Sequence, residues 1–344
     1  MTPVPVPAGY ADMLAYLTAC IDNGWPLGDG LYEYAGTLTI TQHGRRLIGA
    51  GLPSRQSAGS QGGGYGTVLR QTGGVGPAIV VGAPGAYISN IELAGLRVES
   101  AGQSAIQAFN PATCVFRDLS RIGTGGNRAV LHISGGIQST VENVEVSGMG
   151  YPEFAPHGDF ALRAAWGVLI DGGTDEWGNP TLGNCNELRR LYVHQCRTAI
   201  LNDNGNTSIG GNTVIEECLR ALECGATSRT RVDGLYWESV AVGPQAGGYT
   251  PIKLGSWASL YCRNMEGMSG DAQAFVDGDG GDGVLALLIG EGCHLKGTAP
   301  LLGNLKRLDN GPTQGWGMIT GASLPAGMDK GWLTMVVDTR GSGR

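Results

Sequence analysis

The chain has 344 residues, of which 60 are glycine, about 17% where an average protein has about 7%. Charged residues make up only 15% and apolar residues 42%, which excludes a disordered chain, and this much glycine excludes a mostly helical fold. The formal net charge is −7, from 23 Lys and Arg against 30 Asp and Glu, so we expect no nucleic-acid partner.

The N-terminal residues predict a single helix over 10–22, which ends at Asn23-Gly24. Its apolar residues recur at three- and four-residue steps: Met13, Leu14, Leu17 and Ile21. The preceding residues lack the basic start and apolar run of a secretory signal, and no stretch reaches the roughly 18 apolar residues of a membrane span. Alternating residues then predict short strands within 31–51 and at 67–71.

From about residue 78 the sequence repeats a unit that opens with a small residue followed by an aliphatic one, which we expect to point inward. The openings are Ala78-Ile79, Ala105-Ile106, Ala129-Val130, Gly167-Val168, Ala199-Ile200, Ala221-Leu222, Pro251-Ile252 and Ala274-Phe275. Each unit also contains a second alternating strand. Two or three short strands per unit make one coil of a solenoid, and each coil buries its inward residues by stacking on the next. The eight cysteines include no CxxC pair and are expected as buried, reduced thiols.

The whole arrangement resembles the right-handed parallel β-helix of the pectate-lyase-like superfamily, and within it the bacteriophage tailspike and polysaccharide depolymerase group. The resemblance rests on the capping helix, on GLYEYAGTLTI, RRLIGAG and GTVLRQ after it, and on the matching period of coils 78–293. It implies an all-β fold, a single-stranded right-handed parallel β-helix of about 8–10 coils. This solenoid would occupy 25–299, between an N-terminal segment with the capping helix (1–24) and a short β cap or association segment (300–344).

The same resemblance implies a homotrimer that binds, and often cleaves, bacterial surface polysaccharide. It also implies a virion protein, on a phage tail or capsid surface, that folds in the host cytoplasm. The N-terminal residues TPVPVPAG would then contact other virion proteins.

Two aspartates on consecutive coils are the first candidates for catalysis. Counted four residues on from each small residue, the coils carry Phe109, Ile133, Asp171, Asp203 and Gly225, in a column expected to face outward. Carboxylates on neighbouring strands, about 4.8 Å apart, resemble the pair of a retaining glycosidase, and their repulsion would raise one pKa. The alternative is that both aspartates make Asx turns with the residues that follow them.

Two long loops, at 148–166 and 172–184, flank these coils, and long loops on a regular solenoid often build a binding face. The further catalytic candidates on the loops are Asp175, Glu176 and His157. His157 and Asp159 are candidates for acid–base work, and the alternative for this histidine is a solvated side chain. The predicted sugar-stacking residues are Tyr151, Trp166 and Trp177.

Two further acidic groups are weaker candidates. Glu216, Glu217, Asp233 and Glu238, with Trp237 beside Glu238, form either a second substrate-binding surface or a solvated acidic face. The sequence around Asp277, Asp279 and Asp282 fits either a calcium site or a glycine-rich turn, and no other cofactor is expected.

These features leave three functions open. The first is a tailspike-like depolymerase, either a glycoside hydrolase or a polysaccharide lyase, that uses acidic residues on the β-helix face. The second is a non-catalytic receptor-binding or decoration spike. The third is a bacterial polysaccharide lyase or glycoside hydrolase.

Overall fold

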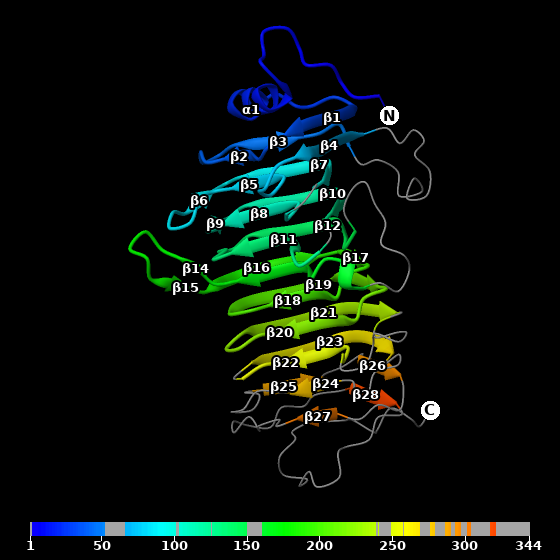
Figure 1. Ribbon diagram of the computed structural model, residues 1–344. Helices are drawn as coiled ribbons and strands as arrows, with labels where there is room; N and C mark the ends of the chain where they lie inside the picture. The colour runs from blue at the N-terminus through cyan, green and yellow to red at the C-terminus, as the bar shows by residue number, and fades with distance from the viewer. Residues whose placement is uncertain are drawn as a thin grey trace.

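The computed structural model describes residues 2–51, 66–100, 103–124, 126–149, 160–238, 240, 249–256 and 258–268, together with the backbone of five strands between 276 and 320. Within these residues the chain winds into a stack of β coils, with the N-terminal helix at one end (Figure 1). The predicted parallel β-helix is therefore confirmed.

Two long parallel sheets form the walls of the stack. Sheet A contains β1 (Gly30–Ala35), β3 (Arg46–Ile48), β4 (Thr67–Gly73), β7 (Glu92–Glu99), β10 (Val115–Gly123), β12 (Thr140–Ser147), β16 (Gly183–Arg189), β17 (Tyr192–His194), β19 (Gly205–Glu216), β21 (Arg229–Glu238), β23 (Ser259–Met268), β25 (Ala286–Ile289), β26 (Cys293–Lys296) and β28 (Gly317–Thr320). Sheet B contains β2 (Leu38–Ile40), β5 (Ile79–Val81), β8 (Ile106–Phe109), β11 (Ala129–Ser134), β13 (Trp166–Asp171), β18 (Thr198–Asn202), β20 (Arg220–Cys224), β22 (Ile252–Leu254), β24 (Val276–Gly278) and β27 (Leu301–Gly303). Two short ladders complete the described strands: β6 (Ile88–Ser89) with β9 (Pro111–Ala112), and β14 (Gly173–Thr174) with β15 (Pro180–Thr181).

Sheet B is built from the predicted repeat, and its inward aliphatic column is fully buried. The column runs Ile79, Ile106, Leu131, Val168, Ile200, Leu222 and Ile252. The predicted register is wrong by one residue in two coils, because Leu131 rather than Val130 pairs with Val168, and Val276 rather than Phe275 pairs with Ile252. A slip of one residue exchanges the inward and outward faces of a strand.

Corners with a left-handed backbone bend the long strands of sheet A. In consecutive coils this position is occupied by Gly95 (φ 67°), Asp118 (φ 52°), Asn143 (φ 53°) and Arg190 (φ 52°). Glycine, Asn and Asp tolerate this conformation best. The side chains also bond across coils, since Nδ2 of Asn143 donates to Oδ1 of Asp118 at 2.7 Å. Asn and Asp therefore occupy some of the left-handed corner positions that we expected to be glycine.

The N-terminal end of the stack is covered by α1 (Met13–Asn23). The helix begins after Asp12, whose carboxylate accepts a hydrogen bond from the backbone N of Ala15, and ends at Gly24, which has a left-handed φ of 68°. Beside it, the backbone N of Val4 donates to the carbonyl of Leu31 at 2.7 Å, so the first residues lie along β1. At the other end both sheets continue beyond residue 300, through β27 and β28.

The described cysteines follow the sequence expectation with one exception, and the helix predicted over 10–22 is found at Met13–Asn23. Six described cysteines are buried free thiols, and Cys185 is the exposed exception. No described helix has the length and apolar character that a membrane crossing requires.

An η2 turn (Phe160–Leu162) is the remaining described element. It leads into the buried Arg163, whose guanidinium lies over the Phe160 ring and donates to the carbonyl of Glu217. The loop predicted at 148–166 is thus anchored at its C-terminal side.

Candidate functional site

An outward column along sheet B brings the two predicted aspartates to equivalent positions on consecutive coils. Ser134 pairs with both Phe109 and Asp171, and the register of β13 with β18 places Asp203 next. Ile133, predicted for this column, is instead buried, because the register of β11 is shifted by one residue.

Asp171 is bound to a histidine on the preceding coil. Nε2 of His132 lies 2.8 Å from Oδ2 of Asp171, and Nδ1 of His132 lies 3.2 Å from the side-chain nitrogen of Gln107, one coil further on. Because that amide nitrogen only donates, Nδ1 accepts and Nε2 carries the hydrogen that it donates to Asp171. The other oxygen of Asp171, Oδ1, is buried without a hydrogen-bond partner among the described residues.

Asp203 lies in a different environment. Burial, and secondarily the negative charges of Asp171 and Glu223, raise the pKa of its carboxyl above the ordinary value. Its carboxylate lies over Gly225, where any Cβ atom would collide with it. Among the described residues neither aspartate accepts a hydrogen bond from the backbone after it, so the alternative of two Asx turns is wrong.

The predicted loop at 172–184 is a hairpin, β14–β15, that projects from the side of the stack (Figure 1). The carboxylate of Asp175 closes its turn. Its carboxylate accepts from the backbone N of Trp177 and of Asn179, and from the Asn179 side chain at 3.0 Å. These bonds, the one from the Asn179 side chain foremost, lower the pKa of Asp175. Trp177 is 77% exposed beside it, and Glu176 is also exposed.

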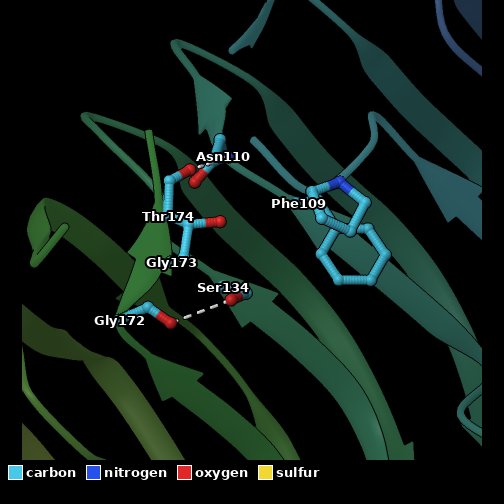
Figure 2. Close-up of a pocket in the computed structure, with 7 residues that line it drawn as sticks. Phe109, Asn110, Ser134, Gly172, Gly173 and Thr174 are labelled. Carbon is cyan, nitrogen blue, oxygen red and sulfur yellow. Dashed lines mark hydrogen bonds between the residues drawn. The ribbon is translucent and has the colours of Figure 1, made fainter. Parts of the chain in front are cut away.

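A pocket of about 160 Å³ lies at the base of this hairpin, in the outward column next to Asp171. Figure 2 shows it between the strand ends of β8 and β11 and the first strand of the hairpin. Its lining residues are Pro84, Phe109, Asn110, Ser134, Gly172, Gly173 and Thr174. Two side chains tie the hairpin to the coils: Oγ of Ser134 donates to the carbonyl of Gly172 at 2.9 Å, and Nδ2 of Asn110 donates to that of Thr174 at 2.8 Å.

No protein-family model and no curated protein sequence matches the chain. Solved structures do. A DFA-IIIase from Arthrobacter chlorophenolicus A6, in complex with GF2, is similar at a TM-score of 0.60 and 11% identity over 93% of this chain and 90% of that one. The C387A mutant of the same enzyme is similar at a TM-score of 0.59, with 11% identity over 92% of this chain and 80% of that one. The DFA-IIIase in complex with DFA-III, without that mutation, is similar at a TM-score of 0.53, with 10% identity over 97% of this chain and 95% of that one. At this identity the likeness shows a shared fold.

The other predicted substrate-binding residues are scattered. Trp237 is wrong as a sugar-stacking residue, because its side chain is fully buried and its Nε1 donates to the carbonyl of Met268. Trp166 is half-buried at the start of β13, and Glu238 lies on sheet A, away from the sheet B column. Tyr151, His157 and Asp159 lie outside the described residues.

The second acidic group forms a separate polar surface on sheet A. Tyr192 donates its hydroxyl hydrogen to Glu216, and Tyr236 donates to Glu238 at 2.8 Å. Burial, followed by the hydrogen bond to Glu216, raises the pKa of Tyr192. Each of these carboxylates is thus satisfied by a tyrosine on the same surface.

The predicted calcium residues are only partly within reach. Asp277 lies in β24, but its side chain and residues 279 and 282 are outside the described part of the chain. Within that part, no group of three His, Cys, Asp or Glu side chains is arranged to hold a metal ion.

His132, Gln107 and Ser134 are the site residues that the sequence did not indicate. The one-residue error in the predicted register of β11 turned His132 and Ser134 inward. With Leu131 in the inward column, His132 lies on the outward face beside Gln107.

Proposed function

We propose that this protein binds a bacterial surface polysaccharide along the outward face of sheet B and hydrolyses a glycosidic bond at Asp171 and Asp203. The observation that carries the proposal is the difference between two stacked carboxyls. One is held by His132, and the pKa of the other is raised by burial and by its acidic neighbours. Two carboxyls whose environments separate their pKa values are the arrangement that an acid and a base require.

In this mechanism Asp203 is the general acid. Its carboxyl, whose pKa is raised by burial, gives a proton to the oxygen of the leaving sugar as the glycosidic bond breaks. At the spacing of a retaining pair, Asp171 is the nucleophile: its carboxylate bonds to the anomeric carbon as the leaving sugar departs, and a water deprotonated by Asp203 then cleaves this glycosyl-enzyme bond. His132 is a positioning residue whose hydrogen bond to Oδ2 fixes the orientation of the Asp171 carboxylate.

Hydrolysis is favoured over elimination by the charges around the site. Elimination requires a cation beside the carboxylate of a uronic acid. On the two strands that follow β18 in sheet B, the described cationic side chains are Arg220 and Lys253. Both form ion pairs with Glu223, at 2.6 and 3.7 Å. The solved structures of the same fold are those of a carbohydrate enzyme, which supports a sugar substrate in general.

The setting we propose is that of a phage tailspike-like homotrimer in the virion, attached through residues 2–9. The support is the sequence resemblance given above. Light scattering of the purified protein would test the trimer, and labelling of virions with an antibody against the protein would test the location.

The test of the activity is a survey of purified capsular polysaccharides and O-chains for release of reducing ends. We expect Asp171→Asn and Asp203→Asn each to lower the rate about 100-fold or more, because acid–base catalysis contributes on that order. Asp29→Asn, an exposed aspartate far along the chain, is the matched control. Cleavage that survives in both variants would place the chemistry elsewhere. Binding to cells without any cleavage would favour a non-catalytic spike.

A further inference from the structure

We infer that the pocket under the β14–β15 hairpin is a binding subsite for one neutral sugar ring, adjacent to the scissile bond. The inference deepens the proposed function and rests on it for one point, that a glycosidic bond next to the subsite is cleaved. The pocket itself is defined by Phe109, Ser134 and the first hairpin strand, independently of any catalysis (Figure 2).

The position of the pocket fits an extended glycan. Phe109, Ser134, Asp171 and Asp203 belong to one outward column on four consecutive strands. Neighbouring strands lie about 4.8 Å apart, so the pocket and the carboxyls are separated by roughly one to two strand spacings. A sugar chain that runs parallel to the stack would place one ring in the pocket and an adjacent linkage at Asp171 and Asp203.

The lining selects for the class of ring. Phe109 supplies an aromatic surface on which the apolar face of a sugar packs. Two donors at the pocket are already used, because the hydroxyl hydrogen of Ser134 is donated to Gly172 and one amide hydrogen of Asn110 is donated to Thr174. Each carbonyl oxygen keeps a second lone pair for a ligand hydroxyl. An acceptor-rich pocket therefore suits a ring that carries hydroxyl donors.

The same lining excludes an acidic sugar. None of the seven lining residues is charged, and the closest charged neighbour in the column is Asp171. A uronate carboxylate placed here would find few donors and would be repelled by Asp171, so its burial would not be compensated.

The hairpin fixes the far wall of the subsite. Pro84 belongs to the loop after β5, and a Cβ added to the next residue, Gly85, would lie 3.4 Å from the carbonyl oxygen of Asp175. The hairpin turn thus packs against that loop and bounds the column beyond Phe109, so the subsite holds a single ring.

Saturation-transfer NMR tests the subsite without any cleavage. The probes are glucose, galactose, mannose and fructose as neutral rings, and glucuronate as the acidic counterpart. We expect at least one neutral monosaccharide to bind the wild-type protein and glucuronate to bind at least tenfold more weakly. Phe109→Ala should weaken the neutral binding about tenfold, while Phe109→Tyr, which keeps the ring, should retain it.

Trp25→Ala is the control, because Trp25 is an exposed aromatic residue that does not line the pocket. Binding should also survive in Asp203→Asn, which separates the subsite from the catalytic proposal. The inference is overturned if no neutral ring binds, if Phe109→Ala binds as well as wild type, or if glucuronate binds equally. Cleavage that persists in Asp203→Asn would overturn the proposed function and leave the subsite standing.

Discussion

Asp171 and Asp203 occupy equivalent positions on consecutive coils, but their carboxyls have different surroundings. Asp171 ends β13 and Asp203 directly follows β18, at equivalent positions, yet His132 precedes one in the stack and Gly225 follows the other. The sequence alone placed the pair and predicted that one pKa would be raised. It could not say which one, because the answer depends on the neighbours that the adjoining coils supply.

The raised pKa of Asp203 makes a stability prediction. The folded protein holds this proton to higher pH than the unfolded chain, whose carboxyl has an ordinary value near 3.8. The folded state therefore binds more protons in this window, and its stability falls as pH rises from that value through the raised pKa. Asp203→Asn should lack this fall. Urea unfolding of both proteins at pH values from about 4 to 7 measures the difference.

Asp29→Asn serves as the control for this comparison, since Asp29 is exposed. A wild-type stability that tracks Asp203→Asn across the whole pH range would contradict the assigned environment of Asp203.

Trp237 lies beside an acidic residue and was therefore predicted to stack on a sugar. The structure places its side chain in the hydrophobic core instead. Its ring packs against Gly267 on the next coil, where any Cβ atom would collide with the indole. We expect Gly267→Ala to destabilise the protein by about 1–3 kcal/mol through overpacking. Gly73→Ala, which meets nothing within 4 Å, should be neutral or slightly stabilising. Denaturant midpoints measure both, and equal midpoints would contradict the packing.

At the scale of elements, the length and the glycines of 172–184 were enough to predict a loop that projects from the coils. What the sequence could not show is the use of Asp175. An Asp-Glu-Trp run in a long loop suggested catalysis, whereas the carboxylate closes the turn by accepting hydrogen bonds from residues two and four positions on. Local side-chain bonds of this kind are a common use of Asp in turns.

Asp175→Ala should therefore loosen the hairpin rather than abolish a chemical step. We expect faster hydrogen exchange in peptides covering 172–184, little change in the denaturation midpoint, and weaker binding of neutral sugars because the pocket loses its wall. Asp175→Asn, which still accepts from backbone N–H groups, should restore most of the protection. A large fall in cleavage rate with unchanged exchange would instead return Asp175 to the catalytic group.

For the whole molecule, the period of the small–aliphatic repeat predicted the solenoid and its inward column, and the helix at the N-terminal end was predicted from its own three- and four-residue period. Six of the eight coils were aligned correctly. The two errors arose where adjacent residues are both small or apolar, as at Ala129-Val130-Leu131. Pattern alone is ambiguous there, and the choice is made by pairing with Ile106 and Val168 on the coils above and below. Stacking, which is non-local, fixed the register and with it the position of His132.

The stacking of coils also predicts how far the effect of a destabilising substitution reaches along the solenoid. Leu131 is fully buried between Ile106 and Val168, so Leu131→Ala should destabilise the protein by about 2–5 kcal/mol through lost burial and a cavity. In a solenoid each coil contacts only its neighbours, so stability is a sum of local terms. Hydrogen exchange should therefore accelerate most in β8, β11 and β13, and least in β1 and β4 at the N-terminal end. Leu162→Ala, at a site 57% exposed, is the control and should change neither. An acceleration spread evenly from β1 to β23 would mean that the coils unfold as a single cooperative unit.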